Sequence, residues 1–282
     1  MKLGWVTDAH FNFLDKSEVE EFCKTVNGSG VGALLLGGDI AEAVDIESWL
    51  DLLDERLKIN AYFVLGNHDY YQGSVTNVRE KMRARNSPRV KWLPATGCVE
   101  LDGNVGLVGH GGWGDARHGD FENSPVILND YLLIEELRET VDIWDIADDF
   151  KERAKLKETL QKLGDDAART LRPHLMRALG NFKRVIVLTH VPPFRDACLY
   201  NNQISDANWL PGFSCKAMGD LLVEAARATP DSDLTVLCGH THGGGYTRIL
   251  PNLEVYTGSA RYGHTYLRIV DVSDERIDID NL

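Results

Sequence analysis

The sequence has few features of a secreted or membrane-spanning protein. Its five cysteines are scattered, and none forms a C-x-x-C pair, which favours a reducing compartment over a disulfide scaffold. Nowhere do about eighteen apolar residues follow one another, so no membrane-spanning helix is expected. The chain enters the apolar run Leu3–Val6 directly after Met1 and Lys2. Without a basic region and apolar leader, we expect a soluble, cytoplasmic protein with no membrane partner.

Positive charge is also scarce. The chain carries 30 Lys and Arg against 43 Asp and Glu, a net charge of −13. Long nucleic acids bind mainly through basic side chains that neutralise phosphates, so a broad duplex-binding surface is not expected. A small phosphorylated substrate is compatible with this charge, because bound metal ions reverse the local sign.

Two common catalytic or nucleotide-binding patterns are missing as well. There is no G-K-[ST] phosphate loop, and no Ser–His–Asp arrangement is evident. The segment Gly109–Gly114 satisfies G-x-G-x-x-G, but polar residues leading to Pro125 follow where a dinucleotide site requires a helix. A dinucleotide site and a covalent serine mechanism are therefore not expected.

What the sequence does contain is a series of short apolar runs rich in Val, Ile and Leu. Such runs are typical of buried strands, and the first ones alternate with helical patterns at 17–26 and 46–57, which indicates an α/β fold. Fewer helices separate the later runs, so we expect mixed sheets. The runs cover residues 3–7, 33–36, 61–65, 105–108, 185–189, 234–238, 253–256 and 266–270.

The stretch from about 115 to 181 has a different character. Apolar residues recur at helical spacing over 150–163, and Gly164 followed by two aspartates predicts that one helix stops and another starts. Pro173 is expected to bend or interrupt the second helix. We interpret the stretch as a mainly helical insertion in a single domain spanning 1–282, either as surface helices or as a cap over an active site.

Asp, Asn and His side chains follow five of the predicted strands. In α/β sheets, ligands bind at the carboxyl ends of the strands. Each residue alone has a local explanation, such as turn capping, but five coincidences of this kind are improbable. The motifs are D-A-H, G-G-D, G-N-H-D, T-H and G-H-T-H, and they contain Asp8, His10, Asp39, Asn67, His68, Asp69, His190, His240 and His242.

The residue types in these motifs are metal ligands. Three carboxyl or carboxamide groups and four imidazoles suffice for two ions that share one bridging carboxylate. Oxygen and nitrogen donors without cysteine suit Mn, Fe, Zn, Co or Ni rather than a structural zinc site. The sequence therefore predicts a site for two divalent or trivalent metal ions.

In this order the motifs resemble the signature of calcineurin-like metallophosphoesterases, from Asp8 to His242. The resemblance implies a four-layer α/β/β/α sandwich with two mixed β-sheets. It also implies that Asp39 bridges the two metals. The remaining ligands would be Asp8, His10 and His242 for one metal, and Asn67, His190 and His240 for the other.

The resemblance further implies hydrolysis of a phosphate ester by a metal-bridging hydroxide. His68 would be the catalytic histidine at the leaving oxygen, oriented by Asp69. Aspartate at position 69, where phosphoprotein-phosphatase-like members carry Glu, favours a small phosphodiester over a phosphomonoester. The alternatives are a nuclease acting on short nucleic acid ends and a non-catalytic binding scaffold.

Residues that recognise the substrate are harder to identify. The loop after the run at 105–108 contains Arg117 and His118, which we predict to contact a substrate phosphate; the alternative is a solvated loop. Trp113, Trp209 and Tyr70 are candidates for an apolar wall, for each of which core packing is the alternative.

Overall fold

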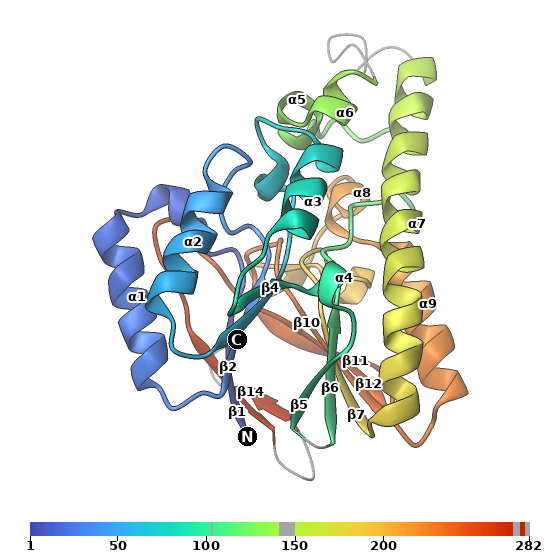
Figure 1. Cartoon of the computed structure of the whole chain (residues 1–282). Helices are drawn as coiled ribbons and strands as arrows, with labels where there is room; N and C mark the ends of the chain where they lie inside the picture. The colour runs from blue at the N-terminus through green and yellow to red at the C-terminus, as the bar shows by residue number, and fades with distance from the viewer. Residues whose placement is uncertain (103, 141–149, 273–276, 280–282) are drawn as a thin grey trace.

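The structure, a computed structural model, describes residues 1–102, 104–140, 150–272 and 277–279. Within this part of the chain the strands form two six-stranded mixed sheets and a two-stranded hairpin. The sheets pack against each other, and helices cover their outer faces (Figure 1). The predicted α/β fold with two mixed sheets is therefore confirmed.

The first sheet contains the amino-terminal strands in the order β14-β13-β1-β2-β3-β4. Its parallel core is formed by β1, β2, β3 and β4, while β13 and β14 add antiparallel strands at one side. The strands are β1 (Lys2–Val6), β2 (Ala33–Gly37), β3 (Asn60–Val64), β4 (Val90–Trp92), β13 (Arg268–Val272) and β14 (Ile277–Ile279), and the covering helices are α1 (Lys16–Gly28), α2 (Ile46–Arg56) and α3 (Val75–Ala84).

The second sheet has the order β11-β12-β10-β7-β6-β5. Its four central strands are parallel, and both edge strands are antiparallel. The strands are β5 (Val99–Asp102), β6 (Val105–Gly109), β7 (Arg184–Leu188), β10 (Asp233–Cys238), β11 (Gly245–Leu250) and β12 (Leu253–Thr257), and the covering helices are α7 (Phe150–Asn181) and α9 (Lys216–Ala228).

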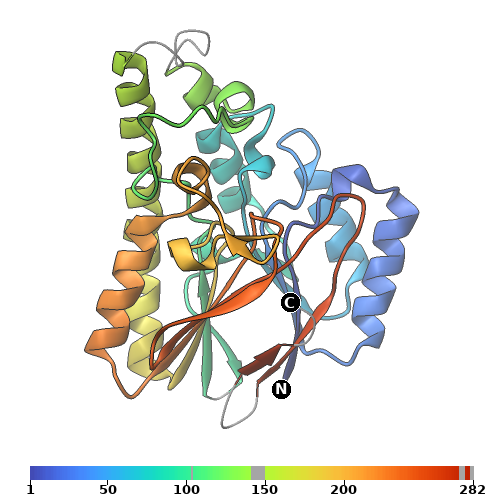
Figure 2. The same cartoon turned by 180° about the vertical axis from the view of Figure 1, so that it is seen from behind.

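Short elements connect these layers. The segment between β7 and α9, yellow to orange in Figure 2, lies over the carboxyl ends of the second sheet's strands. It contains the β8–β9 hairpin, part of which lines a cavity beside the strand ends. The short elements are α4 (Leu93–Thr96), α5 (Asp130–Leu133), α6 (Glu135–Arg138), α8 (Leu210–Phe213), β8 (Leu199–Tyr200), β9 (Gln203–Ile204), and the 3-10 turns Phe11–Phe13, His68–Tyr70 and Arg195–Ala197.

The core explains why the predicted runs are strands. Each central strand is covered by helices on one side and by the other sheet on the other side, so nearly every side chain is buried, as in β2 and β7. Trp5 and Leu35 of the first sheet share one apolar cluster with Leu107 and Leu188 of the second. Burial on both faces selects continuous apolar runs rather than alternating ones.

The stretch predicted to break at Gly164 is instead one continuous helix, α7, and Pro173 lies inside it. Gly164 permits close approach rather than a stop, because a Cβ there would lie 2.6 Å from Cβ of Asp115. Beyond Gly164, the buried side chains of Ala167 and Leu171 pack against α9 and the second sheet. This burial offsets the cost of about 3 kcal/mol that an interior proline imposes.

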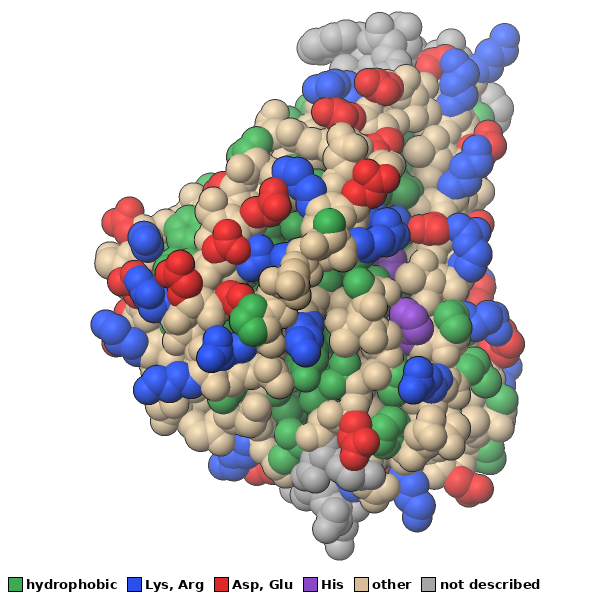
Figure 3. Space-filling view, viewed as in Figure 1, with side chains coloured by type: hydrophobic (Ala, Val, Ile, Leu, Met, Phe, Trp, Pro, Cys, Tyr) green, Lys and Arg blue, Asp and Glu red, His purple; other side chains and the backbone are tan. Residues whose placement is uncertain are grey.

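The structure shows how charged side chains are distributed on one face and that the cysteines are unpaired. Over the face formed by α1, α2, α3 and α7, acidic and basic side chains are interspersed (Figure 3). All five cysteines are free thiols. Within the described ranges, no helix has the length and apolar character needed to cross a bilayer.

The two glycines of α7 provide a matched test of this packing. Alanine normally stabilises a helix by about 1 kcal/mol relative to glycine. We expect Gly164→Ala to lower the free energy of unfolding, because its Cβ would collide with Asp115. Gly180→Ala, where a Cβ has no neighbour within 4 Å, should leave stability unchanged or raise it by up to about 1 kcal/mol. Urea denaturation measures both; equal effects would contradict the packing account.

Candidate metal centre

The five polar motifs meet at one edge of the molecule. Strands β1, β2 and β3 of the first sheet and β7 and β10 of the second all end there, each followed by a short loop. These loops bring together all seven predicted ligands, which come from both sheets: Asp8, His10, Asp39, Asn67, His190, His240 and His242.

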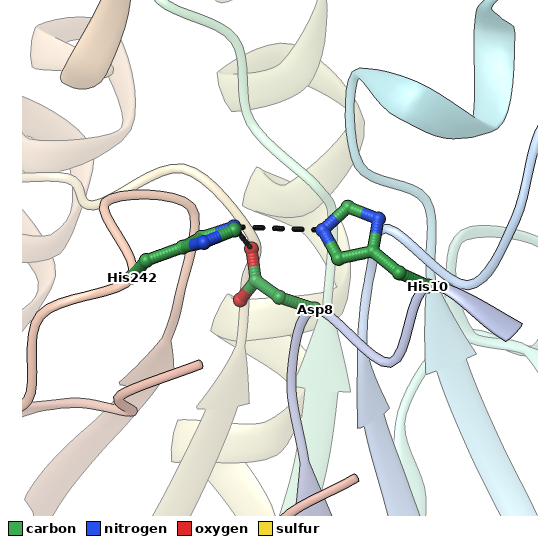
Figure 4. A group of neighbouring side chains, drawn as sticks. All are labelled: Asp8, His10 and His242. Carbon is green, nitrogen blue, oxygen red and sulfur yellow. Dashed lines mark hydrogen bonds and ion pairs between the residues drawn. The ribbon is translucent and has the colours of Figure 1, made fainter. Parts of the chain in front are cut away.

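The first group of donors contains Asp8, His10 and His242, whose ligand atoms all lie within 4.8 Å of one another. Nε2 of His242 is 3.4 Å from Oδ1 of Asp8 and 3.5 Å from Nε2 of His10. Figure 4 shows the three side chains pointing toward a common centre. Thr7 and the backbone N–H of His240 donate hydrogen bonds to the Asp8 carboxylate and fix its orientation.

The second group contains Asp39, His190 and His240, again within 4.8 Å. Nε2 of His190 lies 3.3 Å from Oδ1 of Asp39 and 3.1 Å from Oδ1 of Asn67. Its Nδ1 lies 2.9 Å from the carbonyl oxygen of Gly37, a contact that leaves Nε2 directed at the donors, as is usual for metal-binding histidines.

Asp39 connects the two groups. While Oδ1 faces His190, Oδ2 lies 3.8 Å from Nε2 of His10. One carboxylate with an oxygen toward each group has the arrangement that a bridging ligand requires. The backbone N–H of His68 donates to Oδ1 of Asp39 at 2.9 Å, and Nε2 of His68 lies 3.9 Å from Oδ2.

The backbone of the ligand loops is strained. Among the described residues, nine other than glycine have positive φ, and five of these nine are predicted ligands. Such conformations cost about 1–3 kcal/mol each and concentrate at functional sites. The five are Asp8, His10, Asp39, His240 and His242, with φ between 43° and 71°.

Two glycines make the close approach of these loops possible. A Cβ on Gly66 would lie 2.1 Å from Oδ1 of Asp39, and one on Gly239 would lie 2.1 Å from Oδ2 of Asp8. Both distances are far below van der Waals contact. The glycine in G-N-H-D and the one in G-H-T-H are therefore required because a side chain at either position would collide with a carboxylate.

Burial and neighbouring charges leave most of the donor groups in the protonation states that can bind a metal. Burial opposes ionisation of Asp39, but the charges of His190 and His68 hold its pKa well below the usual range. Burial lowers the pKa of His10 and of His240 to about 4, so both rings are neutral at pH 7. Burial also opposes protonation of His190, yet Asp39 and Asp8 raise its pKa to about 10. His190 would therefore release a proton when a metal binds.

The predicted contact between Asp69 and the His68 ring is corrected. The buried Asp69 carboxylate accepts hydrogen bonds from the backbone N–H groups of Ile40, Ala41 and Gly66 at 2.7–2.9 Å. It therefore ties the loop after β2 to the loop after β3. Any effect of Asp69 on His68 passes through the backbone of these loops.

The predicted substrate contacts of Arg117 and His118 are also corrected. The Arg117 guanidinium pairs with Asp115 at 2.9 Å and with Asp165 of α7 at 2.8 Å. Nδ1 of His118 lies 3.0 Å from Oγ of Ser214. Neither side chain lines the cavity beside the metal ligands. Their loop instead fastens α7 to the body of the fold.

That cavity has a volume of about 590 Å³ and lies over Asp39, Asn67, His68, His240 and His242. Of the three aromatic residues considered above, Trp113 and Tyr70 are buried in the core, whereas Trp209 lines the cavity. Much of the remaining wall, which the motifs did not reveal, is formed by Tyr71, Leu128, Asp130, Tyr262 and the segment 200–213.

Asp130, the first residue of α5, holds the predicted ligand Asn67 in place. Its buried carboxylate accepts hydrogen bonds at Oδ1 from Nδ2 of Asn67 at 2.9 Å and from the Tyr71 hydroxyl at 2.7 Å. With the amide nitrogen occupied in this way, the amide oxygen of Asn67 faces His190. A carboxylate from the 115–181 stretch thus orients a predicted ligand that lies beside the second group.

Comparison with known proteins agrees with this geometry. The family model of calcineurin-like phosphoesterases matches residues 1–244, so the chain belongs to that family and the resemblance of the motifs is confirmed. No curated protein gives a significant sequence match. The donor types and their grouping fit a dinuclear metal site.

Solved structures with the same fold include a dimetal phosphatase from Danio rerio, with 13% identity and a TM-score of 0.62; the alignment covers 99% of this chain and 95% of that one. A phosphopantetheinyl hydrolase from Mycobacterium tuberculosis has 16% identity and a TM-score of 0.59, over 93% and 89% of the two chains. At these identities the likeness establishes the shared fold.

The Asp130 contact predicts an effect on metal affinity. Loss of a group that orients a ligand typically weakens metal binding 10- to 100-fold. We expect Asp130→Ala to weaken one of two Mn²⁺ binding events at least tenfold in calorimetric titration and to leave the other within about threefold. Glu139→Ala, which removes an exposed carboxylate from the same region, serves as the control. Unchanged titration of Asp130→Ala, with the fold intact by circular dichroism, would contradict the assignment.

The buried His110, which lies outside the candidate site, should make the free energy of unfolding depend on pH. Burial and the nearby Arg79 lower its pKa to about 3, and its Nδ1 accepts a hydrogen bond from Gly112. Because the unfolded chain binds the proton near pH 6.5, this contribution is complete above that pH and is lost as the pH falls toward 3.

Between pH 7 and pH 5, wild-type protein with chelator should therefore lose about 2 kcal/mol more stability than His110→Asn. Denaturant titrations at both pH values measure the difference. The exposed His264 provides the control, since His264→Asn should follow wild type. Parallel losses in wild type and His110→Asn would refute the prediction.

Proposed function

We propose that this chain is a metal-dependent phosphoesterase that hydrolyses a small phosphodiester or phosphomonoester. The observation that carries the proposal is the position of Asp39 beside the cavity, with one carboxylate oxygen facing His10 of the first donor group and the other facing His190 of the second. We further propose that residues 1–282 form one domain of a cytoplasmic protein, with 115–181 as a mainly helical insertion. Free thiols at all five cysteines agree with a reducing compartment.

The donor set supports the following proposed ligands. One metal would be held by Asp8, His10 and His242, the second by Asn67, His190 and His240, with Asp39 shared. Mixed oxygen and nitrogen donors are compatible with Mn, Fe, Zn, Co or Ni. When bound, the two ions would supply an activated water and neutralise charge on the phosphate.

His68 is the proposed proton donor to the leaving oxygen. It follows Asn67 directly, its side chain is 16% exposed, and it lines the cavity. Its ring packs 4.2 Å from that of Tyr71 and 4.7 Å from that of His10, measured between centroids. These contacts hold the imidazole beside the ligands while leaving it accessible to an ester oxygen in the cavity.

Activity assays of designed variants test this function. We expect hydrolysis of bis(p-nitrophenyl) phosphate or p-nitrophenyl phosphate in at least one of Mn²⁺, Fe²⁺, Zn²⁺, Co²⁺ or Ni²⁺, and none with chelator. Asp39→Ala should lower kcat/KM at least 100-fold through lost metal. His68→Gln should lower kcat by about 10²–10⁴-fold, the usual contribution of an acid catalyst, with metal content unchanged.

Asp220→Ala is the control, because its carboxylate pairs with Lys216 on the surface of α9, and it should retain wild-type kinetics. Metal content by plasma mass spectrometry separates the two variant effects. Full activity in Asp39→Ala, or no turnover by wild type in any of the five metals, would overturn the two-metal assignment.

A further inference from the structure

The cavity is much larger than a phosphate group. Its volume of about 590 Å³ falls in the range of pockets that enclose a whole organic ligand, about 300–1,000 Å³. The metal ligands occupy one end. Asp130 and Tyr262 lie beside them, in contact with Asn67 and with the rings of His10 and His242 respectively. The rest of the lining comes mainly from the segment 200–213, which is therefore placed to contact the organic part of a substrate.

The charged side chains of the cavity wall outside the candidate ligands are all acidic. Among the described residues that line the cavity, none is Lys or Arg, whereas Asp130 and Asp206 both line it. Oδ1 of Asp130 is occupied by Asn67 and Tyr71, and Oδ1 of Asp206 accepts the backbone N–H groups of Asn208 and Trp209. A second phosphate or carboxylate on the substrate would face these carboxylates with no basic partner.

A row of aromatic rings extends from the metal site into this end. The ring of Phe213 meets His240 edge-on, with centroids 5.2 Å apart. The next ring is that of Trp209, whose centroid lies 5.3 Å from that of Phe213 at an interplanar angle of 33°. Trp209 is 43% exposed, so part of its indole surface is open to a flat ligand.

Residues with hydrogen-bonding side chains line the same cavity as these aromatic rings. They are Asn201, Gln203 and Ser205. Together with the second oxygen of each carboxylate, they offer both acceptors and donors to an uncharged polar ligand. A flat ring with hydroxyl or N–H groups satisfies these partners, whereas a purely apolar group does not.

We infer that this end of the cavity binds an uncharged, polar, ring-bearing group esterified to the phosphate, and that it discriminates against substrates with a second anionic group. The inference rests on the proposed phosphoesterase function, which sets the position of the phosphate. It concerns the organic part of the substrate, which the metal motifs do not determine.

Three p-nitrophenyl phosphodiesters test the inference on the Mn²⁺-loaded protein. They are the methyl ester, the thymidine 5′-ester and the thymidine 5′-ester with an additional 3′-phosphate. We expect kcat/KM to be at least tenfold higher for the thymidine ester than for the methyl ester. The additional phosphate should lower it again by at least tenfold. Equal or faster turnover of the 3′-phosphorylated ester would overturn the charge discrimination.

Turnover of the methyl ester separates this inference from the proposed function. If the methyl ester is hydrolysed but the thymidine ester has no advantage, the assignment of the cavity is wrong and the phosphoesterase assignment stands. Faster turnover of p-nitrophenyl phosphorylcholine than of the thymidine ester would replace the uncharged ring with a cationic group and would also overturn the inference.

Variants locate the effect in the cavity. Trp209→Ala should reduce the preference for thymidine over methyl ester at least fivefold, in line with the strength of base–aromatic stacking. Tyr246→Ala, which removes an exposed aromatic side chain of β11 outside the cavity, should retain the wild-type preference. An unchanged preference in Trp209→Ala would contradict the stacking surface.

A charge substitution provides a gain-of-function test. Gln203→Lys would add a basic group to the cavity wall, so it should reduce the penalty for the 3′-phosphate at least fivefold. Gln203→Glu at the same position should increase that penalty. If the two variants show the same penalty, the charge of this wall does not select the substrate and the inference fails.

Discussion

The contact between Asp39 and His190 is the interaction on which the site depends. Asp39 follows β2 of the first sheet and His190 follows β7 of the second, and their side chains meet at 3.3 Å in a fully buried environment. Asp8 of the first sheet and His242 of the second meet in the same way at 3.4 Å. The separation of the sheets is in turn set by the apolar cluster between them, in which Trp5 and Leu188 are buried. Core packing therefore controls the geometry of the metal centre.

The same arrangement carries a structural cost. Five predicted ligands adopt left-handed backbone conformations, and buried carboxylates approach the backbone so closely that only glycine fits at positions 66 and 239. Strain of this kind persists only where the surrounding structure imposes it. Here the two packed sheets and their covering helices impose the constraint. They hold the loops that follow five strands in positions where the side chains of these loops meet at one centre.

The central strands, and the clustering of the seven predicted ligands, could be predicted from the sequence because both signals are local. Strands buried on both faces are continuous apolar runs, and each predicted ligand lies within four positions of the end of its strand. Asp130 was not assigned a role, since nothing in its neighbours distinguishes it from an ordinary residue at a helix start. Trp209 was one of three candidates for an apolar wall, and the sequence did not separate it from the two that pack in the core. The interpretation of Arg117 failed for a related reason, because its partner Asp165 lies 48 positions away on α7. Likewise, the break predicted at Gly164 ignored the contact with Asp115 that makes glycine necessary there.

The site thus has two parts: a cluster of predicted metal ligands, recognisable from short motifs, and a cavity lined by side chains that only the fold brings together. We propose that two metals share Asp39. Crystals grown with Mn²⁺ and measured at the manganese absorption edge test this claim most directly. The account predicts two anomalous peaks about 3.5–4 Å apart, each in contact with one oxygen of Asp39. A single peak, or two peaks that Asp39 does not join, would contradict it.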